Sequence, residues 1–208
     1  MSEALLIRKE KLRRQAYHAR GAQANKDEVS RTIVERFTAL PEYSAAATVM
    51  WYLDVRSEVR TRHRLADALE SGRRIVIPYS TVDERGEKRL GLWHLTSPGE
   101  LLVGTWNVLE PPRDRWGEPG KEVDPRELDL VMVPGVAFTR DGSRLGNGQG
   151  YYDRLFDRVR PDAPLIALAY ECQLLPELPV GPHDVSMDKV VTEKTVYTGR
   201  GRHTRAGQ

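Results

Sequence analysis

Apolar residues recur along the chain in two patterns, one typical of helices and one typical of buried strands. Helical spacing predicts amphipathic helices over residues 3–20 and around residues 29–37, and a third helix over residues 62–71 that stops at Gly72. Short apolar runs predict buried strands at residues 48–53, 74–78, 91–95, 130–134, 165–170 and 190–198. Because helices alternate with strands that are apolar on both faces, the pattern predicts an α/β fold with a sheet covered by helices.

Two segments show neither the helical nor the strand pattern. Residues 110–125 are rich in proline, glycine and charge and predict a loop. Residues 199–208 are basic and predict a disordered tail, which leaves residues 1–198 as a single domain. The arginines of this tail have no aromatic residues between them that would stack on bases, so a solubilising terminus is favoured over a nucleic-acid-binding segment.

Composition narrows the class of protein. The 208 residues include 32 basic and 30 acidic side chains, and this balance indicates neither a nucleic-acid partner nor a membrane surface. The single cysteine, Cys172, cannot form an internal disulfide bond, so a reducing compartment is expected. The sequence shows no signal peptide and no apolar run of transmembrane length, and we expect a cytoplasmic protein.

The strongest candidate for chemistry is a glycine-rich stretch between the predicted strand at 130–134 and a helical segment that follows Tyr151. Gly146, Gly148 and Gly150 alternate there, which allows backbone N–H groups to approach a polyanion closely. The spacing matches neither the P-loop nor the dinucleotide fingerprint. On glycine spacing alone, a structural loop and a phosphate cradle are equally good interpretations.

Two neighbouring side chains favour the phosphate cradle. Arg144 precedes the glycines, and a guanidinium there can bind phosphate oxygens and offset charge that develops in phosphoryl transfer. Asp153 follows them and is a hard oxygen ligand suited to Mg²⁺. A carboxylate that only stabilises the first turn of a helix is the alternative interpretation of Asp153.

The run DLVMVPGVAFTRDGSRLGNGQGYYDRL, residues 129–155, resembles the signature of the 5-formyltetrahydrofolate cyclo-ligase family, also called 5,10-methenyltetrahydrofolate synthetases. The resemblance covers roughly residues 5–198, because shorter motifs match on both sides of this run. Those motifs contribute Lys9 and Arg13, the stretch from Glu58 to Thr61, and Gln173, His183, Asp184 and Asp188.

The resemblance implies a three-layer αβα sandwich with a mixed, mostly parallel sheet, akin to the NagB, RpiA and CoA-transferase folds. It implies an ATP- and Mg²⁺-dependent conversion of 5-formyltetrahydrofolate to 5,10-methenyltetrahydrofolate, with release of ADP and phosphate. The expected partners are therefore these small molecules, with no nucleic acid and no membrane, and the protein is expected to be a monomer.

The resemblance also assigns residues to the site. ATP contacts map to Lys9, Arg13, Arg144, Leu145, Gly146, Asn147, Gly148, Gln149, Gly150, Tyr151 and Tyr152, with Arg144 as the catalytic residue. Folate contacts map to Leu53, Glu58, Trp106, Asn147, Gly148, Gln149, Gly150 and Tyr151. The implied Mg²⁺ ligands are Asp153 and Asp188. Gln149 departs from the family, which often has glycine or lysine there, and this departure leaves a side-chain phosphate contact at that position in doubt.

Physical chemistry alone leaves several of these roles open. Lys9 and Arg13 lie about 40° and about 80° from Leu5 around an ideal helix, where their charges can reach a cleft or remain solvated on the surface. Glu58 can accept hydrogen bonds from the N–H groups of a pterin ring, or can stabilise a helix start near Ser57.

Three other functions remain as alternatives: a nicotinamide- or flavin-dependent oxidoreductase, a nucleic-acid-binding protein, and a catalytically altered paralogue. The oxidoreductase fingerprint belongs near the first strand, whereas this glycine loop lies in the last third of the chain. The intact run from Arg144 to Asp153 disfavours an altered paralogue.

Overall fold

The computed structural model of the chain describes residues 3–104, 108–179, 181 and 184–202. Its helices are α1 (Glu3–Ala22), α2 (Lys26–Thr38), α3 (Pro41–Ala45), α4 (Leu65–Glu70) and α5 (Tyr151–Phe156). Its 3₁₀ turns are η1 (Arg62–Arg64), η2 (Pro98–Glu100), η4 (Arg113–Arg115), η5 (Pro125–Glu127) and η6 (Glu171–Gln173). Its strands are β1 (Thr48–Met50), β2 (Arg74–Val82), β3 (Lys88–Leu95), β4 (Leu102–Val103), β5 (Leu109–Glu110), β6 (Leu130–Val133), β7 (Ala137–Phe138), β8 (Arg144–Leu145), β9 (Leu165–Leu168), β10 (Lys189–Val191) and β11 (Val196–Thr198).

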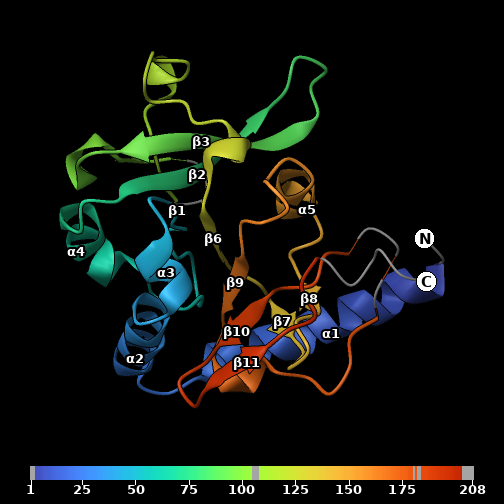
Figure 1. Cartoon of the computed structure of the whole chain (residues 1–208). Helices are drawn as coiled ribbons and strands as arrows, with labels where there is room; N and C mark the ends of the chain where they lie inside the picture. Colours follow the sequence, from blue (N-terminus) through green and yellow to red (C-terminus); the bar gives the residue numbers. More distant parts are fainter. Residues whose placement is uncertain (1–2, 105–107, 180, 182–183, 203–208) are drawn as a thin grey trace.

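Seven strands form one mixed sheet in the order β11-β10-β9-β6-β1-β2-β3 (Figure 1). The five inner strands are parallel, and the two edge strands, β11 and β3, are antiparallel to their neighbours. From β1 the chain builds the sheet outward through β2 to one side and later through β6, β9 and β10 to the other. The order of strands therefore reverses between β1 and β6, which is where open α/β sheets form ligand crevices.

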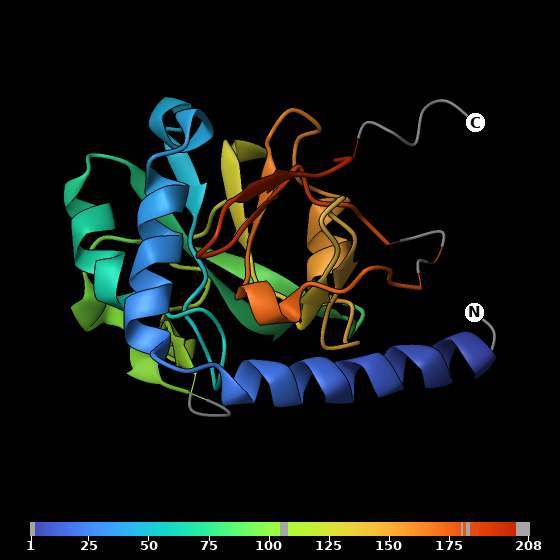
Figure 2. The ribbon, with the colours of Figure 1, turned by 90° about the horizontal axis from the view of Figure 1, so that it is seen from below.

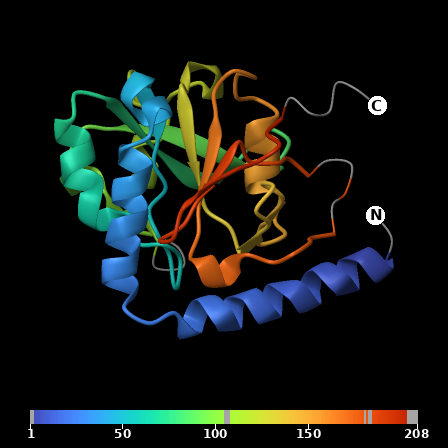
Figure 3. The ribbon, with the colours of Figure 1, turned by 60° about the horizontal axis from the view of Figure 1, so that its bottom comes forward.

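Helices cover both faces of the sheet, as Figure 3 shows with the layers seen edge-on. On one face α2 and α4 bury residues such as Phe37 and Leu65 against Trp51 and Ile77. On the other face α5 packs against residues of β6, β9 and β10. The predicted α/β sandwich with a mostly parallel sheet is thus confirmed, while the kinship with the NagB, RpiA and CoA-transferase folds stays a prediction.

Helix α1 lies across the layers rather than within one of them, and its N-terminal end extends past the body of the molecule (Figure 2). It packs on η6 and on the small hairpin of β7 and β8 through a separate apolar cluster that includes Ala16 and Leu145. This helix, predicted over residues 3–20, thereby contacts the segment that contains the glycine loop.

Some elements differ from the sequence-based predictions. The run at 190–198, predicted as one strand, is a hairpin of β10 and β11, because the hydroxyl of Thr192 accepts the N–H groups of Lys194 and Thr195 and turns the chain. The hairpins β4–β5 and β7–β8 were not predicted, since two-residue strands are too short to show a period.

The C-terminal segment continues the fold beyond residue 198. Backbone N–H groups of Gly199, Arg200 and Gly201 donate to carbonyls of Asp188, Asp141 and Met187 at 2.8, 2.8 and 3.0 Å. The domain therefore includes residues 199–202. Within the described ranges, no helix combines the length and the apolar character needed to cross a lipid bilayer.

Candidate active site

A cavity of about 920 Å³ opens at the carboxyl edge of the parallel strands, beside the point where the strand order reverses. Its walls come from the segments that follow β1 and β6, from the β2–β3 hairpin, from residues 108–116 and from the glycine loop. The predicted site residues that line it are Leu53, Glu58, Arg144, Gly146, Asn147, Gly148, Gln149, Gly150, Tyr151, Tyr152 and Asp153. Residues predicted to bind ATP and residues predicted to bind folate thus face one continuous space.

The three glycines of the loop admit arginine side chains that a Cβ atom would displace. At each glycine, a Cβ atom would lie only 2.8–3.0 Å from the nearest guanidinium nitrogen. The pairs are Gly146 with Arg144, Gly148 with Arg13, and Gly150 with Arg154. Gly148 and Gly150 also have φ angles of 82° and 70°, in the left-handed region that favours glycine. The alternating glycines therefore let three cations pack directly on the loop backbone.

The backbone N–H groups of this loop find no acceptor among the residues that the structure describes. Among the described hydrogen bonds, none is donated by the amides of residues 146–150. Asn147, Gly148 and Gln149 are exposed and Gly146 and Gly150 are half-buried, so these amides are open to the cavity and can donate to an anionic ligand.

Arg144 is held rigidly at the base of the loop, and only 6 % of its side chain is exposed. Its guanidinium donates to Asp153 Oδ1 at 2.9 Å and to the carbonyl oxygen of Pro134 at 3.3 Å. The rings of Tyr152 and Phe156 lie 5.4 and 5.3 Å from its Cζ atom, within cation–π range. Arg144 and Asp153, predicted to contact phosphate and metal, therefore form an ion pair at the cavity wall.

The part of helix α1 that bears Lys9 and Arg13 supports the loop from behind, and neither residue lines the cavity. Arg13 Nε donates to the carbonyl oxygen of Gly146 at 2.9 Å. Lys9 is 7 % exposed and its ammonium contacts Asp184 Oδ2 at 2.6 Å. Leu145 packs into the small apolar cluster under the same helix. These three predicted ATP contacts thus lie outside the lining of the cavity, on the side of the loop that faces α1.

The folate end of the cavity is formed around Glu58, which is 7 % exposed. Its Oε2 atom accepts the backbone N–H of Val55 at 3.0 Å. Burial raises the pKa of the Glu58 carboxyl to about 7, although the charge of Arg20 opposes this rise. Burial likewise raises the pKa of Tyr52 and Tyr152, and the negative charge of Glu58 raises both further. The floor of the cavity is therefore a region where negative charge is costly.

Arg20 and Tyr17 line the cavity but were not predicted from the sequence. Arg20 is 2 % exposed and donates to Ser57 Oγ at 2.9 Å and to the Gly135 carbonyl oxygen at 3.0 Å. Tyr17 hydrogen-bonds Asn147 and lies under the Arg20 guanidinium. Both extend the helical row that begins at Lys9 and Arg13, so the spacing of polar residues along α1 was the signal that could have found them.

The predicted pair of metal ligands is not brought together at the cavity. Asp153 lines it, whereas Asp188 lies before β10 and its Oδ2 atom accepts the backbone N–H of Leu165 at 2.7 Å. Asp184, from the same C-terminal part of the chain, forms an ion pair with Lys9 on α1 and does not line the cavity either. Trp106 and His183 lie outside the described residues.

The residues present fit a nucleotide-bound Mg²⁺ ion rather than a metal held by protein alone. Within the described ranges, no group of three or more His, Cys, Asp or Glu side chains is close enough to bind a metal. Mg²⁺ usually keeps several waters and takes one or two carboxylates together with phosphate oxygens. Asp153, whose side chain is 42 % exposed beside the free amides of the loop, is a carboxylate of this kind.

Comparisons with known proteins identify the family of the chain. The sequence profile of the 5-formyltetrahydrofolate cyclo-ligase family matches residues 6–193. A 5-formyltetrahydrofolate cyclo-ligase of Mycolicibacterium smegmatis is 36% identical over 147 residues, which are 71% of this chain and 74% of that protein. A mouse protein of the same name is 29% identical over 170 residues, covering 77% of this chain and 80% of the relative.

A solved structure shares the fold as well. The NMR structure of the 5,10-methenyltetrahydrofolate synthetase of Aquifex aeolicus superposes with a TM-score of 0.77 at 30% sequence identity, covering 96% of this chain and 99% of that one. The family profile spans most of the chain and the fold is shared over nearly all of it. The chain therefore belongs to the 5-formyltetrahydrofolate cyclo-ligase family.

Proposed function

We propose that this protein converts 5-formyltetrahydrofolate to 5,10-methenyltetrahydrofolate with consumption of ATP, in the presence of Mg²⁺. One observation carries the proposal: the free amides of the glycine loop, the guanidinium of Arg144 and the buried carboxyl of Glu58 face a single cavity of about 920 Å³. A reaction between two ligands needs a shared space of this size, near the upper end of the range for small-molecule sites.

The glycine loop binds the triphosphate in this proposal. The amides of residues 146–150 donate to phosphate oxygens, and the guanidinium groups of Arg13, Arg144 and Arg154 surround the same backbone. Arg13 acts through the loop, since it contacts the carbonyl of Gly146 and not the cavity. Lys9 keeps α1 attached to the segment around Asp184.

Arg144 is the catalytic residue of the proposal. Its position is maintained by Asp153, Pro134 and two aromatic rings, so little reorganisation is needed when charge develops on the transferring phosphoryl group. Asp153 is the residue that would hold a nucleotide-bound Mg²⁺ ion, which would supply neutralisation of phosphate charge. Phosphate oxygens can then take over the contact with Arg144 that Asp153 provides in the free protein.

Glu58 receives the pterin ring in this proposal. An ionised Glu58 accepts hydrogen bonds from pterin N–H groups, and Leu53 and Tyr151 provide apolar surface beside it. Arg20 lies against the Glu58 loop and favours the ionised form. Trp106 stays a predicted contact of the same ligand.

The chemistry follows from the poor leaving ability of a formamide oxygen. The formyl oxygen attacks the terminal phosphorus, the bond between that phosphorus and the bridging oxygen breaks, and ADP leaves. The other folate nitrogen then attacks the formyl carbon and loses its proton to water, and the carbon–oxygen bond breaks with release of phosphate. The residues of the chain align the two ligands and offset the charge on the phosphoryl group.

The decisive experiment mixes the purified protein with 5-formyltetrahydrofolate and MgATP and follows the absorbance band of the methenyl product. We expect the band to grow with release of one ADP per product, and no ADP release when folate is omitted. ADP release that is independent of folate would indicate a different nucleotide-dependent enzyme. Absence of both signals would exclude the proposed reaction.

A further inference from the structure

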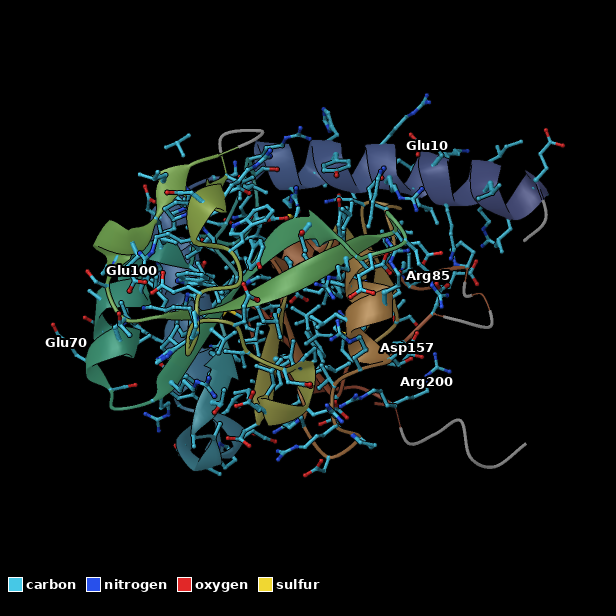
Figure 4. All side chains as sticks on the ribbon, turned by 90° about the horizontal axis from the view of Figure 1, so that it is seen from above. Glu10, Glu70, Arg85, Glu100, Asp157 and Arg200 are labelled. Carbon is cyan, nitrogen blue, oxygen red and sulfur yellow. The ribbon has the colours of Figure 1, made fainter. Side chains whose placement is uncertain are left out.

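The β2–β3 hairpin extends past the carboxyl edge of the sheet and forms one wall of the cavity. In Figure 4 it passes in front of α5 and below α1, with Arg85 labelled at its turn. The carboxylate of Asp83 accepts the backbone N–H groups of Arg85 and Glu87, each at 2.9 Å. The turn is therefore well ordered, and it returns the chain to the cavity at Lys88, the first residue of β3.

Lys88 is the residue of this hairpin that touches the glycine loop. Its Nζ atom donates to Gln149 Oε1 at 2.7 Å. The carbonyl oxygen of Lys88 accepts a hydrogen bond from Nε of Arg154. The same guanidinium donates to the Gln149 carbonyl oxygen at 2.9 Å. Side chain and backbone of Lys88 are thus both attached to the loop, although the two segments are about sixty residues apart in the sequence.

No residue in the described part of the chain neutralises the positive charge of Lys88. Gln149 is uncharged, and among the described residues the Lys88 ammonium forms no ion pair. The nearby carboxylate of Asp153 is already paired with Arg144. Both Lys88 and Gln149 line the cavity, next to the five loop amides that lack acceptors.

We propose that Lys88 is a further nucleotide-binding residue, which contacts the triphosphate held by the glycine loop and is positioned for this contact by Gln149. An ammonium group has three donors, so one hydrogen bond to Gln149 leaves two for phosphate oxygens. The loop itself has no lysine, and β3 supplies this cation from the facing wall. The inference rests on the proposed use of ATP and adds a specific residue to it.

The direct test is calorimetric binding of a non-hydrolysable MgATP analogue to the whole protein, without folate. Lys88→Gln is expected to raise the dissociation constant about 10- to 100-fold, the loss typical of a charge-assisted hydrogen bond. Lys88→Arg is expected to retain most of the affinity, because the charge stays at the same place. Arg85→Gln is the matched control, since it removes a cation from the turn of the same hairpin outside the cavity lining and is expected to bind like the wild type.

A variant that moves the positive charge from the hairpin to the loop makes the test more specific. The double variant Lys88→Gln, Gln149→Lys moves the ammonium from the hairpin to the loop and is expected to recover affinity to within a few-fold of the wild type. Wild-type affinity in Lys88→Gln, or an equal loss in Arg85→Gln, would overturn the inference. So would a double variant that binds no better than Lys88→Gln.

This test separates failure of the inference from failure of the proposed function. A wild-type protein that binds the nucleotide but makes no methenyl product would contradict the proposed reaction and leave the role of Lys88 measurable. A wild-type protein that makes the product, with an unchanged Michaelis constant for ATP in Lys88→Gln, would contradict the role of Lys88 alone. Thermal unfolding of each variant shows whether the hairpin remains folded.

Discussion

The buried carboxyl of Glu58 is expected to make the protein less stable as the pH rises. Its pKa is raised from 4.5 to about 7, because burial penalises the charged form more than Arg20 and the Val55 N–H favour it. Between these two values the folded chain keeps a proton that the unfolded chain has released, so stability falls as pH increases. The difference of about 2.5 between the two pKa values corresponds to about 3 kcal/mol of unfolding free energy.

Glu58→Gln removes the pH dependence of stability that is due to Glu58, and it replaces only one oxygen of the side chain by nitrogen. The amide oxygen can still accept the Val55 N–H, and the side chain cannot ionise. Below about pH 4.5 Glu58 is protonated in both states, and the two proteins are expected to be equally stable. Above pH 7 the full penalty applies to the wild type, so the variant is expected to be more stable there by up to about 3 kcal/mol.

Urea unfolding at pH 4.5, 6, 7 and 8, followed by tryptophan fluorescence, measures this difference. Glu118→Gln is the matched control, because the hydrogen bond from Arg115 lowers the pKa of the half-buried Glu118 from its ordinary value of 4.5, at the lower limit of the experiment. That control is expected to give a curve parallel to the wild type. Parallel curves for Glu58→Gln as well, or a variant less stable than the wild type at pH 8, would refute the assignment of a raised pKa.

The stability gained by Glu58→Gln should be accompanied by a loss of function. In the proposed site an ionised Glu58 accepts pterin N–H groups, and the amide presents a donor to them. The Michaelis constant for folate is therefore expected to be higher in Glu58→Gln than in the wild type. In the wild type it is expected to fall as the pH is raised through 7, because Glu58 then ionises. If both results are obtained, Glu58 is a case in which stability is exchanged for activity.

Three further predictions concern the nucleotide end of the cavity. Arg144→Ala is expected to lower kcat by a factor of about 10³ or more, and Arg144→Lys to recover little of it; turnover near the wild-type value would make Arg144 a structural residue. Lys9→Ala breaks the ion pair that attaches α1 to the segment around Asp184, so it is expected to lower the unfolding temperature and to weaken use of both substrates; a salt-dependent rise in the Michaelis constant for ATP alone would make Lys9 a direct phosphate contact. Asp153→Asn is expected to raise the Mg²⁺ concentration needed for half-maximal activity. Asp188→Asn is expected to lower the unfolding temperature and to leave that Mg²⁺ concentration unchanged; a raised Mg²⁺ requirement in Asp188→Asn would make Asp188 a metal ligand.

Local patterns predicted the sheet and the glycine loop because both depend on neighbours in the sequence. Apolar runs such as residues 130–134 and 165–170 are strands because both of their faces are buried, and three glycines within five residues indicate close backbone contacts wherever they occur. Lys88 and Tyr17 could not be assigned in this way. Their place at the cavity depends on contacts with Gln149 and Asn147, which lie 61 and 130 residues away in the chain.

Asp188 shows how the direction of a strand decides the role of a carboxylate. It precedes β10 as Asp129 precedes β6, and each carboxylate accepts backbone N–H groups at the start of a neighbouring parallel strand: Asp188 from Leu165, and Asp129 from Ala47 and Thr48. In a parallel sheet the starts of all strands meet at one edge and their ends at the other, where the cavity lies. Asp188 and Asp129 therefore stabilise the amino edge of the sheet. In the proposed site, a ligand for a nucleotide-bound metal would come from a segment that returns to the carboxyl edge, as the one bearing Asp153 does.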